Sequence, residues 1–105
     1  YKKDIDDVRE SPALEIMSLL EEKGANLCYH DPFVPQLHKM RNYDFSRLAS
    51  IELTEELMWE QDAVVIATDH TDIDYQWLVD HSSLVVDTRN ATRKVTGNLN
   101  KIVRA

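Results

Sequence analysis

The chain has 105 residues, of which 43% are hydrophobic and 30% are charged, and its formal net charge is −7. This length allows one domain around one hydrophobic core, and the composition is that of a globular protein. The negative charge argues against broad binding of nucleic acid or of a membrane surface, and no apolar run approaches a membrane span, so we expect neither partner. The single cysteine, Cys28, cannot form an internal disulfide, which fits a reducing compartment.

The first predicted element is a helix. Ser11 and Pro12 are typical of a helix start, because Ser caps free backbone N–H groups and Pro fits the first turn. The apolar residues that follow recur with helical spacing, and Gly24 is typical of the position just after a helix, so we predict a helix over 12–23. Residues 25–31 then predict a short strand.

The rest of the chain alternates between helices and strands. The run AVVIAT at 63–68 is β-branched and apolar, which is typical of a strand covered on both faces of a parallel sheet. The other predicted elements are an irregular segment at 33–50, a helix at 54–61, a loop and short helix at 69–82, and strands at 83–88 and 101–104. This alternation predicts an α/β fold, namely a Rossmann-like, three-layer open parallel sheet with helices on both faces.

One strand of this fold is expected to be missing. A doubly wound sheet normally begins with a strand that lies at its centre. Here charged residues lead directly into the first helix instead. We therefore expect residues 1–105 to be a single domain of a larger protein, cut at or just past the end of its first strand.

Basic residues stand at the predicted strand ends, where ligands of open α/β sheets bind. Lys2 and Arg9 would follow the missing strand, and Arg89 follows the strand at 83–88. Three cations on one rim suit a diphosphate, which Arg can hold with two parallel hydrogen bonds. The alternative is that they form ordinary surface ion pairs with neighbouring acids, and composition alone favours that reading.

Other polar residues give weaker signals. The pair Asp4 and Asp6 suggests a phosphatase-type site, but no buried strand precedes it. His70 lies among three aspartates whose spacing matches no known metal site, so turn and capping roles are expected for those acids and no metal is predicted. The chain also contains no glycine-rich phosphate loop.

Three residues are predicted to be buried rather than functional. Cys28 alternates with apolar neighbours inside a predicted strand, so it is expected to be a small core residue and not a nucleophile. Trp59 and Trp77 lie on predicted short helices, where core packing is the expected role, with an interface role as the alternative.

Four motifs occur in one order along the chain: YKKDIDDVRESPALEI, YHDP, VVIATDH and VVDTRN. Together they resemble the C-terminal UDP-binding domain of the UDP-glucose/GDP-mannose dehydrogenase family, over essentially the whole chain. The resemblance implies a full-length enzyme that uses NAD to oxidise the C6 alcohol of a nucleotide sugar to a carboxylate in two steps. Such an enzyme has an NAD-binding Rossmann domain, a long central helical region that carries the interface of a homodimer, and this domain.

The finer likeness concerns the sugar. The threonines and asparagine of IATDH and DTRNAT look more like the UDP-N-acetylglucosamine or UDP-N-acetylmannosamine 6-dehydrogenase branch than the UDP-glucose branch. Membership of that branch would imply a bacterial, cytoplasmic enzyme that supplies sugars for surface polysaccharide synthesis. A UDP-sugar substrate and the rest of the parent enzyme are then the expected partners.

The resemblance also implies roles for individual residues. Lys2 would contact the nucleotide sugar, with Tyr1 lining the nucleotide pocket beside it. Arg9 would reach the NAD that the first domain binds, and Arg89 would bind the nucleotide end of the substrate. The family's catalytic cysteine, with its lysine and asparagine helpers, lies upstream of this domain, and Cys28 matches none of them. No catalytic residue is therefore expected here, and the domain alone is expected to be inactive.

Two alternatives remain open. The C-terminal domain of a GDP-mannose dehydrogenase shares the architecture and differs in the nucleotide that it prefers. A stand-alone α/β binding or interaction module would need a self-sufficient sheet, so the missing first strand counts against it.

Overall fold

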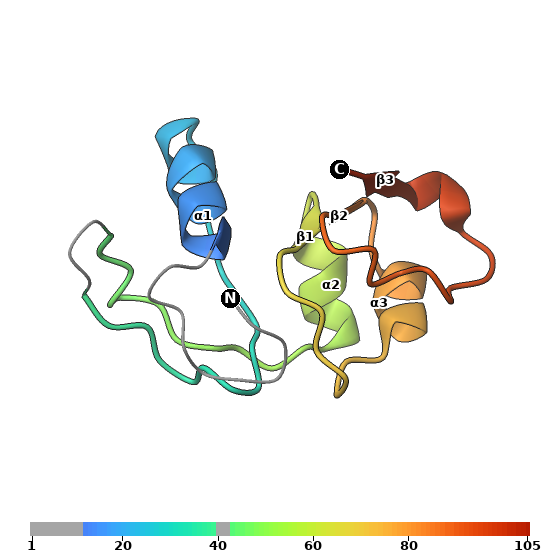
Figure 1. Cartoon of the computed structure of the whole chain (residues 1–105), viewed down its shortest axis with the longest axis horizontal. Coiled ribbons are helices and arrows are strands. Elements are labelled where there is room, and N and C mark those ends of the chain that lie inside the picture. Colours follow the sequence, from blue (N-terminus) through green and yellow to red (C-terminus); the bar gives the residue numbers. More distant parts are fainter. Residues whose placement is uncertain (1–11, 40–42) are drawn as a thin grey trace. The chain divides into compact units, whose positions relative to one another are not determined.

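The computed structural model describes residues 12–39 and 43–105. These residues fall into two compact units, one within residues 1–52 and one within 53–105, and each is described by itself (Figure 1). Among the helices of the described ranges, none is both long and apolar enough to cross a membrane.

The first unit opens with helix α1, Pro12–Glu22, as predicted. The helix ends because Gly24 adopts a φ of +92°, a conformation that costs glycine little. The backbone N–H of Gly24 donates to Glu21 O at 3.0 Å, and that of Ala25 donates to Leu20 O at 3.1 Å. These two bonds satisfy carbonyl groups that the last helical turn leaves open, which is the Schellman arrangement.

The strand predicted at 25–31 does not form. Tyr29 makes a single parallel bridge with Ser50, and Ile51 N donates to Tyr29 O at 2.9 Å. Asp31 then turns the chain, because its Oδ1 accepts from the backbone N–H of Phe33 at 2.8 Å. A strand needs a neighbouring strand for a continuous ladder, and the described part of this unit supplies only the bridge.

A small core holds the irregular remainder of the first unit. Its buried members are Leu14, Val34, Leu37 and Phe45. Residues 33–39 and 43–50 form turns and one antiparallel bridge, Gln36 to Ala49, as expected of the irregular segment. The amide of Gln36 adds donors to Ser46 O at 2.9 Å and Leu48 O at 2.7 Å, so a side chain replaces part of the missing ladder.

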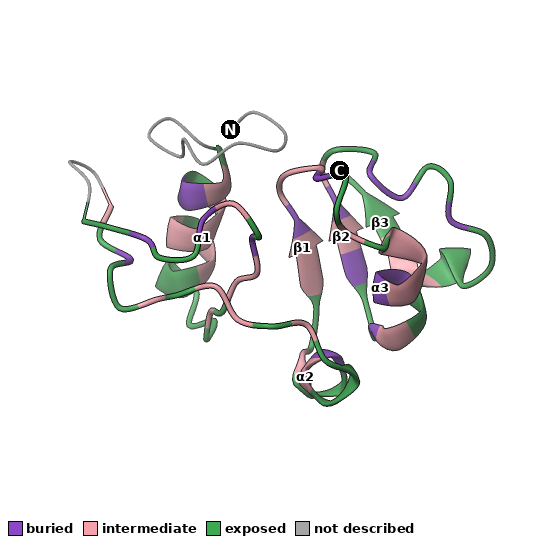
Figure 2. Cartoon of the chain, turned by 90° about the horizontal axis from the view of Figure 1, so that it is seen from below, coloured by how far each residue is buried: buried purple, intermediate pink, exposed green. Residues whose placement is uncertain are grey.

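The second unit is built on a parallel sheet, which confirms the predicted α/β fold class (Figure 2). Its strands are β1 (Val64–Ile66), β2 (Val85–Asp87) and β3 (Ile102–Arg104), paired in the order β1-β2-β3. Val64, Val85 and Ile102 stand at one register position. All three strands lie within the stretches predicted for them.

A short helix precedes each of these strands. These helices are α2 (Glu55–Glu60), α3 (Tyr75–His81) and the 3-10 helix η1 (Leu99–Lys101). Thr54 caps α2, with its Oγ1 accepting from Leu57 N at 3.1 Å, and Asp74 caps α3, with its Oδ1 accepting from Trp77 N at 3.1 Å. Both caps satisfy N–H groups that a first helical turn leaves free.

The core of the second unit lies between the sheet and these helices. Its buried members are Met58, Ile66, Leu78, Val79, Val85, Ala91 and Val95. The last two come from the loop after β2, so two apolar side chains anchor that loop in the core.

Two of the three residues predicted to be buried are exposed. Cys28 is exposed, because its segment forms no strand and so has no sheet face to cover it. Trp59 is 64% exposed: the six-residue helix α2 turns Met58 inward, and the next residue points elsewhere. Trp77 packs against the core of the second unit, as predicted.

Candidate functional site

The strands of the second unit end at a common edge of the sheet, where polar segments follow β1 and β2. We call residues 67–70, 88–93 and 104–105 the carboxyl edge. Thr88 ties two strand ends together there, because its backbone N and its Oγ1 donate to Ile66 O at 3.2 Å and 2.7 Å. Ligands of open parallel sheets bind beyond such ends, so the carboxyl edge is the candidate site.

Asp87, the last residue of β2, organises this edge. Its side chain is only 1% exposed, and it faces the loop that follows. The Oδ1 atom accepts from the backbone N–H groups of Arg89 at 3.0 Å and Ala91 at 3.1 Å. The Oδ2 atom accepts from Thr92 N at 2.9 Å and Thr92 Oγ1 at 2.6 Å. One buried carboxylate therefore collects four donors from three residues of the loop.

The same bonds decide the charge state of Asp87. Burial acts to raise the pKa of the carboxyl, because it disfavours the ionised form. The hydrogen bonds from Thr92 and from two further backbone N–H groups outweigh burial, so the pKa of Asp87 lies below its ordinary value. Asp87 is therefore ionised, and its two carboxylate oxygens accept hydrogen bonds from the loop that follows it.

The loop itself makes a sharp turn that brings these donors together. Asn90 has a φ of +57°, in the left-handed region that asparagine tolerates better than most residues. Ala91, Thr92 and Val95 are buried beyond the turn, whereas Arg89 on its near side is exposed. The turn thus buries one side of the loop and leaves the Arg89 guanidinium at the surface of the carboxyl edge.

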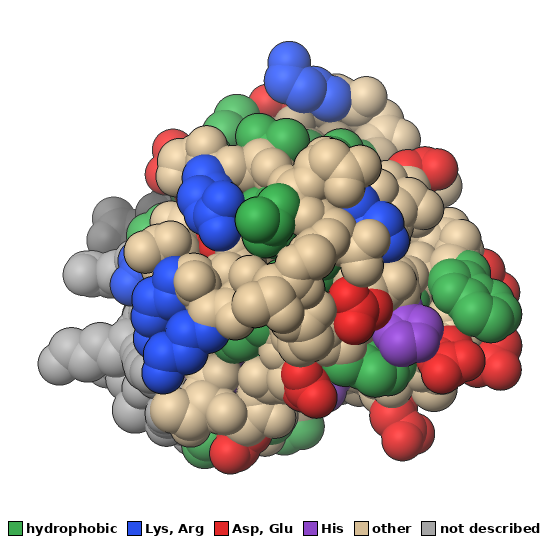
Figure 3. Space-filling model, turned by 90° about the vertical axis from the view of Figure 1, so that its right-hand side faces the viewer, with side chains coloured by type: hydrophobic (Ala, Val, Ile, Leu, Met, Phe, Trp, Pro, Cys, Tyr) green, Lys and Arg blue, Asp and Glu red, His purple; other side chains and the backbone are tan. Residues whose placement is uncertain are grey.

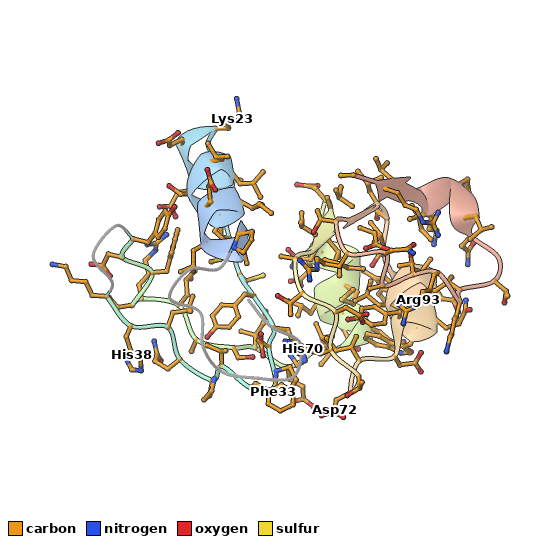
Figure 4. The ribbon with its side chains drawn as sticks, in the orientation of Figure 1. Lys23, Phe33, His38, His70, Asp72 and Arg93 are labelled. Carbon is orange, nitrogen blue, oxygen red and sulfur yellow. The ribbon has the colours of Figure 1, made fainter. Side chains whose placement is uncertain are left out.

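A second arginine braces the edge. Arg93 Nη1 lies 3.2 Å from Asp69 Oδ2 and donates to Asn90 O at 3.0 Å (Arg93 is labelled in Figure 4). It therefore joins the loop after β2 to the loop after β1. At the end of β3, Arg104 Nη2 lies 3.4 Å from Thr92 Oγ1. Of the three arginines on the carboxyl edge, these two are therefore bound to other residues of the protein.

Arg89 differs from both, because its guanidinium has no ion pair or hydrogen bond with another described residue. Both acids of the area already have partners: Asp87 accepts four hydrogen bonds and Asp69 is paired with Arg93. An acidic domain thereby presents a locally basic edge. In Figure 3, basic side chains lie in several places on the face seen there, most of them toward its left, while most acidic ones lie toward its right and bottom.

The loop after β1 is fixed by a tyrosine from α3. Tyr75 OH accepts from His70 N at 3.0 Å and lies 3.5 Å from Thr68 O. Burial raises the pKa of Tyr75 to about 12, and the nearby charge of Asp69 adds to this effect, so the phenol stays a neutral hydrogen-bonding group. His70 is only 2% exposed, which makes it an interior residue of this loop.

The aspartates around His70 have separate structural roles. Asp74 caps α3 and Asp69 pairs with Arg93, while Asp72 lies at the turn between β1 and α3 (Figure 4). The capping role predicted from the sequence is thus confirmed for Asp74. Within residues 12–39 and 43–105, no group of three or more His, Cys, Asp or Glu side chains is arranged to hold a metal ion.

The residues predicted for the nucleotide site fall into two groups. Tyr1, Lys2 and Arg9 lie outside the described residues. Arg89 lies on the carboxyl edge, directly after the strand predicted for it. The role of Asp87 was not predicted from the sequence. Two features could have indicated it: Asp87 is a charged residue at the end of an otherwise apolar strand, and Thr92 follows it five positions later.

One of three comparisons with known proteins found a match. The family model described as "UDP-glucose/GDP-mannose dehydrogenase family, UDP binding domain" matches residues 1–94. No curated protein and no solved structure matched the chain. The matched region contains α1, the parallel strands β1 and β2, and the complete loop around Arg89. The chain belongs to the UDP-glucose/GDP-mannose dehydrogenase family, as its UDP-binding domain.

Proposed function

We propose that this domain binds the nucleotide part of the substrate in an NAD-dependent UDP-sugar 6-dehydrogenase, which oxidises the C6 alcohol to a carboxylate in two steps. The observation that carries the proposal is Arg89, an exposed guanidinium without a described partner, on a loop that is hydrogen-bonded to Asp87 at the carboxyl edge. The family match to a UDP-binding domain supports the assignment of its ligand.

The chemistry of Arg89 suits a diphosphate. A guanidinium presents parallel N–H donors that match two phosphate oxygens, and such charge-assisted hydrogen bonds are stronger than neutral ones. The chain as a whole carries a net charge of −7, which repels anions at long range. Binding of UDP therefore depends on a local cation whose acidic neighbours are already paired, and the carboxyl edge provides it.

The family likeness also suggests roles for three residues outside the described ranges. Lys2 contacts the nucleotide sugar, Tyr1 lines the nucleotide pocket, and Arg9 reaches toward NAD. These roles rest on the family likeness of the YKKDIDDVRESP motif.

NAD itself does not fit the described residues of this domain. A dinucleotide needs a glycine-rich turn at a helix start, and the chain has two glycines. Gly24 follows α1 and Gly97 precedes η1, so neither forms such a turn. We therefore assign most of the NAD site and the catalytic cysteine to other parts of the enzyme. The isolated domain should show no turnover.

The proposed substrate is a UDP-N-acetylhexosamine, which is converted to its uronic acid for surface polysaccharide synthesis in the bacterial cytoplasm. The support is the likeness of IATDH and DTRNAT to that branch. The proposed enzyme is a homodimer. GDP-mannose is the comparator substrate, because the family name covers both nucleotides.

The test is NADH formation by the full-length protein that carries this chain, with UDP-N-acetylglucosamine, UDP-N-acetylmannosamine, UDP-glucose and GDP-mannose. We expect turnover with a UDP-sugar and the highest kcat/KM with an N-acetylhexosamine. Absence of NADH with every nucleotide sugar would refute the proposal. UDP binding without any turnover would favour the stand-alone binding module instead.

Variants of two arginines test the site. Arg89→Ala should raise the KM for the nucleotide sugar roughly 10- to 100-fold, the range for losing a hydrogen-bonded charge partner. Arg47→Ala is the matched control, since it removes the same charge from an arginine that pairs with Glu21 in the first unit. Equal effects of the two substitutions would contradict the role of Arg89.

A further inference from the structure

We propose that Asp87 is a positioning residue for substrate binding, whose carboxylate holds the loop at 88–92 in the one shape that presents Arg89 to the phosphates. This inference rests on the proposed function and adds a residue that does not itself touch the ligand. An acid beside an anion site would ordinarily weaken binding, because like charges repel. The geometry shows how Asp87 escapes that conflict.

The link from Asp87 to Arg89 is direct. The backbone N–H of Arg89 is one of the four donors to the carboxylate, at 3.0 Å from Oδ1. The backbone of Arg89 is therefore fixed at its own amide, while its side chain stays exposed and without a described partner. A fixed backbone lowers the number of arrangements that the guanidinium loses when it binds, and such preorganisation favours affinity.

The remaining donors fix the far side of the turn. Thr92 supplies both its N–H, at 2.9 Å, and its hydroxyl, at 2.6 Å, and it is fully buried. The left-handed Asn90 lies between the two anchored sides, so loss of either anchor frees the turn. The carboxylate of Asp87 is 1% exposed, and its hydrogen bonds spread its charge into the loop rather than toward the ligand.

Braces elsewhere on the edge do not replace this anchor. Arg93 contacts Asn90 O and Asp69, and so connects the turn to the neighbouring loop. Neither contact reaches the backbone of Arg89. Thr88 fixes the strand end itself through its two hydrogen bonds to Ile66 O, and the hydrogen bond to Asp87 is the described contact that holds the backbone of Arg89 beyond it.

The test is a double-mutant cycle read by UDP titration calorimetry on the full-length protein. Asp87→Asn removes the acceptor of Thr92 N and so frees the far side of the turn, which should weaken UDP binding about tenfold in the background that retains Arg89. In the Arg89→Ala background the same substitution should change the affinity less than about twofold, because Asp87 acts through Arg89. In steady-state assays Asp87→Asn should raise the KM for the nucleotide sugar and leave kcat within about twofold.

Asp80→Asn is the matched control. Asp80 likewise accepts hydrogen bonds through its carboxylate, from the side chains of Gln76 at 3.0 Å and Asn98 at 2.9 Å, but it lies on α3 outside the carboxyl edge. It should leave the UDP affinity unchanged. A purely structural role for Asp87 predicts equal losses in both backgrounds, and that result would overturn the inference while leaving the proposed function intact. If Arg89→Ala alone leaves UDP binding unchanged, the assigned role of Arg89 fails, and the inference fails with it.

Thr92 provides a second route to the same question should Asp87→Asn fail to fold. Thr92→Val removes the hydroxyl donor to Asp87 at nearly constant volume, whereas Thr92→Ser keeps it. We expect UDP affinity to fall about threefold to tenfold with Val and to stay within about twofold with Ser. Equal affinities of the two variants would also overturn the inference.

Discussion

The substitution Asp87→Asn tests how much the hydrogen bonds of the buried carboxylate stabilise the second unit. The amide keeps one oxygen, which can still accept from the backbone N–H groups of Arg89 and Ala91 in place of Oδ1. Its NH2 group then stands where Oδ2 accepted from Thr92 N, so one buried N–H loses its acceptor. Leaving a buried donor unsatisfied costs about 1–3 kcal/mol, and we expect the free energy of unfolding to fall by that amount near neutral pH.

The difference between the two proteins should shrink in acid. The folded-state pKa of Asp87 lies below its unfolded value, for which the reference is 3.8, so the ionised carboxylate stabilises the fold fully only above that value. As the pH falls through the lower folded-state pKa, this contribution disappears. The Asn variant has no such titration, so its free energy of unfolding should approach that of the natural chain as the pH drops below about 3.8.

Urea unfolding followed by tryptophan fluorescence measures the effect, because both tryptophans, Trp59 and Trp77, belong to the second unit. The free energies of unfolding of the two proteins would be compared from pH 7 down to pH ~3. A difference that stays constant or widens with acid would refute the claim that the ionised form of Asp87 is the stabilising one. A difference below ~0.5 kcal/mol at neutral pH would show that the loop tolerates a missing acceptor.

Three further substitutions or titrations test individual elements. Thr54→Ala removes the side-chain acceptor for the first turn of α2 and should lower the free energy of unfolding by about 1 kcal/mol in urea titrations, while Thr54→Ser should restore most of it. Leu78 is a core residue and only 5% exposed, so Leu78→Ala should lower the free energy of unfolding by about 2–5 kcal/mol. Leu99 is 52% exposed, so Leu99→Ala should lower it by less than about 0.5 kcal/mol. Similar values for the two variants would contradict the described core. Tyr75, with a pKa raised to about 12, should ionise near that pH in an ultraviolet titration of the folded chain, and Tyr75→Phe should remove that step. The fold favours the neutral phenol, so the stability that Tyr75 contributes is lost as the pH rises toward 12.

Much of the fold follows from short-range patterns. The end of α1 depends on Gly24 and on carbonyls three and five residues before their donors, so the helix boundary is local information. Thr54 caps α2 through a residue three positions away, and the caps can be recognised in the sequence for that reason. The β-branched runs that became β1 and β2 are likewise local, because strands covered on both faces are continuously apolar.

The wrong predictions share a different origin. Residues 25–31 have a strand-like pattern, yet a strand depends on a neighbour, and Tyr29 finds only a single bridge to Ser50, 21 positions away. Cys28 is exposed as a result, although its alternation with apolar residues predicted burial. The exposure of Trp59 depends on which face of the short helix α2 packs inward. So short a helix has too few positions for a periodic pattern to identify its buried face.

By itself, the sequence determined the fold class, the order of the elements from α2 to β3 and the position of Arg89 directly after a predicted strand, because each depends on residues within a few positions of one another. Only the tertiary structure decided what surrounds Arg89. The pairing of Arg93 with Asp69 joins residues 24 positions apart, and it exists because two parallel strands end side by side. Asp87 is an ionised, buried anchor rather than a surface acid because a turn at Asn90 folds the following donors back onto it.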